Sequence, residues 1–143
     1  MKNIQGLKFK LALQFHLDGD QVGYKVHGGE WPKGPGVYAV YENNTLVYIG
    51  KYQRGVMYRW VKQKKRGLYH FKKDQVAASL KDGKTVQVFA EQEDALKQTI
   101  NSSTSQWINV SGIEAHLVEA CGLDLPWNKN GKKKPSDVYR TLR

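Results

Sequence analysis

The sequence predicts an α/β protein of the α+β sandwich type, with a central three-stranded antiparallel sheet that is flanked by helices and preceded by an N-terminal β-hairpin extension. Short segments rich in β-branched and aromatic residues are separated by turn-prone residues, and segments with helical spacing of apolar residues lie between and after them. The 143 residues, 40% of them hydrophobic, are enough for one domain with its own core. We expect a single domain, 1–143, with a hairpin extension (1–30), a core (36–128) and a basic tail (129–143).

The N-terminal hairpin is indicated by two alternating segments, Leu7–Phe15 and Gln21–Val26. Asp18-Gly19-Asp20 between them has the composition of a tight turn. Gly28–Gly36 is dense in glycine and proline, which interrupt regular structure, so we expect a connecting loop there.

Three further strands are expected to form the central sheet. Val37–Tyr41 and Leu46–Ile49 are separated by the turn-prone Glu42–Thr45, the clearest hairpin pattern in the chain. Thr85–Glu91 has the same strand composition and completes the three.

Four helices are expected around this sheet. From Gly55 to Arg66 the apolar residues repeat at helical spacing and most other positions are cationic, which predicts a basic amphipathic helix. Asp74 suits the N-cap of a second helix that stops at Gly83. Glu93–Thr99 fits a short helix, and Ile113–Cys121 fits a last one that Gly122 ends.

The charge distribution favours a polyanionic partner. The formal net charge is +10, and Lys51–Lys73 carries nine basic residues without an acid, whereas Asp82–Asp124 carries seven acids against two bases. Charge alone does not separate DNA, RNA, an anionic membrane and an acidic protein, and a charged run is often only a solvated face. The candidate phosphate contacts are Arg54, Lys62, Lys64, Lys65, Arg66, Lys132, Lys133 and Lys134.

Several classes of protein are disfavoured by the composition. The single cysteine, Cys121, forms no internal disulfide and no thiolate zinc site by itself. No segment approaches the length of a membrane span, and the N-terminal residues lack the apolar stretch of a secretory signal. We therefore expect a cytoplasmic protein without a membrane partner.

Two tyrosine motifs carry the functional signal. Gly36-Val37-Tyr38 is followed after nine residues by Tyr48-Ile49-Gly50, and an arginine, Arg59, lies in the next expected helix. This arrangement resembles the GIY-YIG endonuclease family. Lys51 directly after the second motif, Glu114 with Leu117-Val118 behind it, and Asn128 after a proline and an aromatic residue follow in the family's order.

The resemblance departs from the family pattern at a few positions. The family often has His or Tyr one helical turn after the arginine, where this chain has Gln63, and Tyr69 or His70 from the following residues are the alternatives. Arg59 lies one residue further from Gly50 than is usual, and the stretch from Glu114 to Asn128 is about two residues long for the family. These shifts fit small loop insertions.

The resemblance implies hydrolysis of DNA phosphodiesters with one divalent ion, normally Mg²⁺, for which Mn²⁺ substitutes. Glu114 would supply the hard oxygen ligand, and Arg59 a planar donor fork for the phosphate. Tyr38 would orient the attacking water and accept its proton, with its pKa lowered by Lys51, Arg59 or the metal. Tyr48 would bind phosphate or brace the cleft, and Asn128 would fix the tail or a phosphate.

Two other readings stay open from the sequence. A basic nucleic-acid-binding module that keeps the fold without cutting is the main alternative, and an interaction domain with this fold is the third. Similar stand-alone members include phage and restriction endonucleases, which favours double-stranded DNA over RNA as the partner. Cutting both strands with one site per chain requires a homodimer or two successive nicks, and the sequence does not choose between them.

Overall fold

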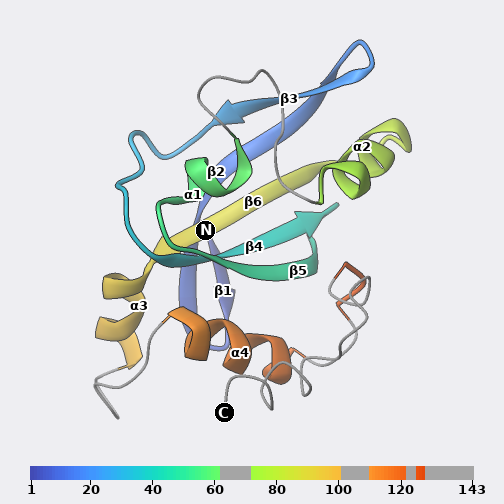
Figure 1. Ribbon diagram of the computed structural model, residues 1–143. Helices are drawn as coiled ribbons and strands as arrows, with labels where there is room; N and C mark the ends of the chain where they lie inside the picture. The colour runs from blue at the N-terminus through green and yellow to red at the C-terminus, as the bar shows by residue number, and fades with distance from the viewer. Residues whose placement is uncertain (62–71, 101–109, 122–124, 128–143) are drawn as a thin grey trace.

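The computed structural model describes residues 1–61, 72–100, 110–121 and 125–127 (Figure 1). Within these residues, six strands form one antiparallel sheet with the order β1-β2-β6-β4-β5, and β3 also pairs with β2. The strands are β1 (Lys2–Ile4), β2 (Leu7–Asp18), β3 (Gln21–Val26), β4 (Gly36–Glu42), β5 (Thr45–Tyr52) and β6 (Val86–Gln92).

The sheet is larger than the three strands that the sequence predicted. The N-terminal hairpin is not a separate extension, because β2 pairs with β6 from Lys10 to Gln14. With 12 residues, β2 is long enough to pair with β6 along one edge and with β1 and β3 along the other. The short β1 was not predicted, and it reaches β2 through Gln5-Gly6, where both residues have a positive φ, as a two-residue hairpin turn requires.

Four helices lie in the described ranges: α1 (Val56–Trp60), α2 (Lys73–Lys81), α3 (Glu93–Ile100) and α4 (Val110–Ala120). The prediction that α1 continues to Arg66 is wrong, because Val61 is extended (φ −135°, ψ 143°) and buried. The N-cap of α2 is Lys72 rather than Asp74, which lies in the first turn. None of these four helices has the length and the apolar character of a transmembrane segment.

The core has two parts, one on each face of the sheet. Residues of β4 alternate between them: Val37 and Ala39 pack with α3 and α4, whereas Tyr38 and Val40 pack with α1 and α2. In Figure 1, α4 runs beside β5 while α1 and α2 lie on the opposite side of that strand. Since β5 ends the sheet, side chains from the two faces can meet around its outer edge.

The register of the β4–β5 hairpin explains the glycines of both tyrosine motifs. Tyr38 lies opposite Gly50, and Gly36 lies opposite Tyr52. A Cβ atom at position 50 would come within 2.4 Å of the Tyr38 ring carbon Cζ, and one at position 36 within 2.1 Å of the Tyr52 hydroxyl. Each tyrosine ring therefore occupies the space that a side chain on the opposite strand would need.

We predict that Gly50→Ala destabilises the protein by about 1–3 kcal/mol, because the added methyl group overpacks a buried ring. Gly23→Ala is the matched control within a strand: its Cβ would meet the side chain of the exposed His16, which can swing away. Urea denaturation of the two variants measures the difference. Equal stability of Gly50→Ala and the wild-type protein would contradict the packing described for Tyr38.

Candidate active site

Five residues with the predicted site chemistry come together from four elements. Tyr38 lies on β4, Tyr48 and Lys51 on β5, Arg59 on α1 and Glu114 on α4. Arg59 and Glu114 both act electrostatically on the two tyrosines, and Lys51 acts on Glu114. The site lies at the edge of β5, where Glu114 from one face of the sheet meets the tyrosines of the other.

The two tyrosines form a hydrogen-bonded pair. Their ring centroids lie 5.9 Å apart, and Tyr38 is fully buried whereas Tyr48 keeps 9% of its surface exposed. The bond between the side chains raises the pKa of Tyr38 and lowers that of Tyr48. Tyr48 is thus the member of the pair that keeps some contact with solvent, and Tyr38 lies deeper in the core.

Burial dominates the acid-base properties of this pair. The sequence led us to expect a lowered pKa for Tyr38, but desolvation raises it well above the ordinary value, and the opposing charge of Arg59 does not compensate. Burial and the charge of Glu114 raise the pKa of Tyr48 to about 12, against the smaller lowering effects of Tyr38 and Arg59. Both tyrosines are therefore neutral phenols at physiological pH.

Arg59 is positioned by the aromatic residue that follows it. Trp60 is fully buried, with its ring edge-on to Tyr38 at 5.3 Å and tilted against Phe15 at 5.4 Å. Because α1 has only five residues, burial of Val56 and Trp60 fixes the direction in which Arg59 leaves the helix. The helical spacing of apolar residues from Gly55 to Arg66 includes Trp60, but it does not predict this support of Tyr38.

Glu114 is the acid of the site. Its side chain is half-buried, and burial raises the pKa to about 7 although Lys51 and Arg59 pull it down. Glu119, the other acid on α4, is exposed to solvent, as its position on the helix predicts. Lys51 also donates from Nζ to Ser111 Oγ at 2.8 Å, and this bond ties the end of β5 to the first turn of α4.

Lys72 is a site neighbour that the sequence analysis missed. It is 5% exposed, donates from Nζ to the Trp127 carbonyl oxygen at 2.7 Å, and lies 5.2 Å from the centroid of the Tyr48 ring. Desolvation lowers the pKa of its ammonium group. The backbone N–H of Trp127 in turn donates to the Val47 carbonyl oxygen at 3.0 Å. In the sequence, Lys72 is one cation at the end of a long basic run, and nothing distinguishes it.

Several predicted residues lie outside the described part of the chain. Asn128 follows Trp127 directly, and its own placement is not described. The others in this group are Lys62, Gln63, Lys64, Lys65, Arg66, Tyr69, His70, Lys132, Lys133 and Lys134. Among the predicted phosphate contacts, Arg54 is described, and its side chain is exposed.

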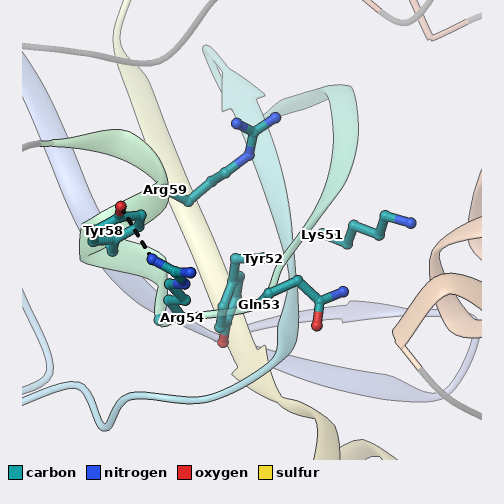
Figure 2. Close-up of a pocket in the computed structure, with 7 residues that line it drawn as sticks. Lys51, Tyr52, Gln53, Arg54, Tyr58 and Arg59 are labelled. Atoms are coloured by element: carbon teal, nitrogen blue, oxygen red, sulfur yellow. Dashed lines mark hydrogen bonds between the residues drawn. The ribbon is translucent and has the colours of Figure 1, made fainter.

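A pocket of about 340 Å³ adjoins the site between the end of β5 and α1. Figure 2 shows Lys51 and Gln53 on one side, Arg54 and Tyr58 together on the other, and the Arg59 guanidinium directed away from that pair. The lining residues are Lys51, Tyr52, Gln53, Arg54, Gly55, Tyr58 and Arg59. Three of these seven carry a positive charge and none is acidic, so the pocket suits an anion.

The donor set fits one hard divalent cation better than zinc. The described residues contain no cluster of three or more His, Cys, Asp or Glu side chains that could hold a metal. Mg²⁺ needs no such cluster, because one carboxylate, several waters and a substrate phosphate commonly complete its shell. The Glu114 carboxylate, which burial disfavours in its ionised form, would be stabilised by such a cation.

The comparisons with known proteins give little beyond this geometry. No protein-family model matches the chain, and no curated protein matches it. Among solved structures, the chain is similar to that of a mutant of bacteriophage T4 EndoII, with 23% sequence identity and a TM-score of 0.41. The match covers 59% of this chain and 65% of that chain, less than two thirds of its length. A likeness of this extent defines neither the fold nor the activity.

We predict that the stability of the protein in EDTA falls as the pH rises from about 4.5 to about 7. Glu114 has a folded-state pKa of about 7 against an ordinary value of 4.5, so in this window the folded chain holds a proton that the unfolded chain releases. Stability from this group is complete below pH 4.5 and is lost as the pH rises through 7. Urea denaturation of the wild-type protein and Glu114→Gln across this range measures the effect.

Glu114→Gln should not show the loss of stability that Glu114 causes between pH 4.5 and 7. Glu119→Gln is the control, because it changes an exposed acid of the same helix and should keep the wild-type profile. If the curves of the wild-type protein and Glu114→Gln run parallel from pH 4.5 to 7, Glu114 is not in the buried environment described above.

Proposed function

We propose that this protein is a magnesium-dependent endonuclease of the GIY-YIG type that hydrolyses phosphodiester bonds in DNA. The observation that carries the proposal is the meeting of Tyr38, Tyr48, Lys51, Arg59 and Glu114 at one edge of the sheet. A binding module needs cations and a scaffold, but it has no need of a half-buried carboxylate beside a pair of phenols. The resemblance of the two tyrosine motifs to the family supports the same activity.

The cations would hold the scissile phosphate. Arg59 offers a planar fork of donors to two phosphate oxygens, and Lys51 adds a point charge on the other side of the pocket. Charge accumulates on the non-bridging oxygens as water adds to phosphorus, so these two groups stabilise the transition state more than the substrate. The bond from Lys51 to Ser111 limits the movement of its ammonium group before the substrate arrives.

Glu114 would hold the magnesium ion together with waters and a phosphate oxygen. The bound ion would act as a Lewis acid on the phosphate. The negative charge of Glu114 raises the pKa of both tyrosines. A cation bound to the carboxylate would offset this effect. The raised pKa of Glu114 means that this site is best prepared for a cation above about pH 7, where the carboxylate is ionised.

Tyr48 would contact the attacking water, and Tyr38 would keep the Tyr48 hydroxyl in place. This differs from the role first expected for Tyr38, because its side chain is fully buried and hydrogen-bonded to Tyr48. Because Tyr48 is a neutral phenol, its oxygen would accept a hydrogen bond from the water and orient it. The oxygen of the water forms a bond to phosphorus, its proton passes to solvent, and the bond to the departing oxygen breaks. The departing oxygen then takes a proton from solvent.

Double-stranded DNA is the substrate that we propose. Arg54 and basic residues outside the described ranges would contact backbone phosphates, which position a protein without reading bases. These outer contacts are Lys62, Lys64, Lys65, Arg66, Lys132, Lys133 and Lys134. Asn128 would contribute an amide to the same site.

We predict that Tyr48→Phe lowers the cleavage rate by about 10²-fold, the cost of misplacing a reacting group, because the attacking water loses the oxygen that orients it. Tyr38→Phe should reduce the rate less, because Tyr48 keeps its hydroxyl and loses only the partner that holds it in place. Both changes keep the rings in the core, so urea denaturation should give folded variants. The measurement is single-turnover cleavage over a range of pH. A Tyr48→Phe variant that cuts at the wild-type rate would overturn the assigned roles.

We predict that Glu114→Ala abolishes cutting but leaves a folded protein that still binds DNA, because loss of the carboxylate reduces repulsion toward phosphate. Nicking of supercoiled plasmid with Mg²⁺ or Mn²⁺ measures cutting, and titration with labelled duplex DNA in EDTA measures binding. Glu119→Ala, on the exposed side of α4, should keep its activity. Wild-type protein that binds DNA but never nicks it with either ion would leave the non-catalytic binding module as the function.

A further inference from the structure

The pocket beside the site has a second wall that phosphodiester hydrolysis does not use. Arg54 and Tyr58 form this wall, and they lie together in Figure 2, apart from the Arg59 guanidinium. Arg54 follows the end of β5, and Tyr58 is the residue of α1 next to Arg59. The pocket thus joins the cations proposed for the scissile phosphate to an aromatic surface.

Tyr58 is unusual among the aromatic residues of this chain. With 55% of its surface exposed, it is the only exposed aromatic side chain in the described ranges, although its neighbours Val56 and Trp60 are fully buried. It makes two recorded contacts with Arg54: a hydrogen bond from Nη1 to the hydroxyl at 3.5 Å, and a cation–π contact with the guanidinium carbon 5.6 Å from the ring centroid. Arg54 therefore holds both the hydroxyl and one side of the ring, and with 55% of the residue exposed the ring keeps surface that is open to solvent.

The chemistry of this wall matches one class of ligand. A binding groove for an unpaired nucleic acid strand combines cations for the phosphates with exposed aromatic rings on which bases stack. Here Lys51, Arg54 and Arg59 supply the cations and Tyr58 supplies the ring within one pocket. A paired base within a duplex has both faces covered by its neighbours, so a ring at this place can reach only a base that has left the stack.

We propose that Tyr58, held by Arg54, is a stacking site for an unpaired nucleobase of the bound strand, next to the phosphate that Lys51 and Arg59 contact. The preferred substrate is then DNA with a locally unpaired nucleotide, such as a bulge or a junction, rather than a uniform duplex. This inference rests on the proposed function for the position of that phosphate. The stacking itself needs only that the pocket binds a nucleic acid strand.

The test is equilibrium binding of the full chain in EDTA, where cutting is suppressed. Two duplexes of equal length are compared: one is fully paired, and the other carries a single unpaired 2-aminopurine. Wild-type protein should prefer the second duplex, and binding should quench the 2-aminopurine fluorescence as the base stacks. Tyr58→Leu should weaken binding of the second duplex by roughly 5- to 150-fold, the range for loss of one stacked base.

Two variants complete this experiment. Tyr58→Phe keeps the ring and should keep both the preference and the quenching. Val26→Ala shortens another exposed apolar residue, on β3, and should leave the binding of both duplexes unchanged. Circular dichroism confirms that the three variants are folded.

The outcomes separate this inference from the proposed endonuclease. If Tyr58→Leu keeps the preference and the quenching while the wild-type protein nicks plasmid, the stacking site is wrong and the endonuclease stands. If the wild-type protein never nicks but Tyr58→Leu loses the preference, the stacking site stands without the activity. If the wild-type protein binds neither duplex, both are overturned.

Discussion

The β4–β5 register is the constraint on which the site depends. Tyr38 lies opposite Gly50, and Tyr52 lies opposite Gly36. Each ring packs against the glycine backbone of the neighbouring strand, where any residue with a Cβ atom would push the ring away. This leaves Tyr38 deep enough to pack against Trp60 and close enough to bond Tyr48. A shift of one residue would turn every one of these side chains to the other face of the sheet. The Asn43-Asn44 turn, with both residues at positive φ, sets the pairing of Tyr41 with Leu46. An irregularity between Val40 and Tyr41 then shifts the register by one residue, and this shift brings Tyr38 opposite Gly50.

The same packing explains the electrostatics. Groups that titrate in the site do so in surroundings from which most water is excluded, and burial outweighs the nearby charges in the pKa of both tyrosines and of Glu114. The cations Lys51 and Arg59 line the adjoining pocket, and Lys51 is held by its hydrogen bond to Ser111. The buried tyrosines are thus uncharged while the residues that line the adjoining pocket are cationic. This arrangement favours the binding of an anionic ligand.

Local patterns predicted the parts of the fold that depend on local chemistry. The β4–β5 hairpin follows from turn residues between two strand-like runs, and α3 and β6 lie within about one residue of their predicted limits. Features set by distant contacts were missed: β1, the pairing of β2 with β6, and the end of α1 at Trp60, where Val61 keeps the helical spacing but is extended and buried. Lys72 and the direction of the Tyr38 pKa were missed because both depend on burial, which spacing does not reveal.

The hydrogen bond from Lys72 to the Trp127 carbonyl oxygen bears on the order in which the site forms during synthesis. Most of the sheet and the residues on β4, β5 and α1 are complete by residue 92, but Glu114 and Trp127 are translated later. When only the sheet has left the ribosome, the nascent chain has the two tyrosines and the cations of the site but not the Glu114 carboxylate. It also lacks the Trp127 carbonyl oxygen that accepts the hydrogen bond from Lys72. The site is therefore finished by segments that emerge after the sheet that receives them.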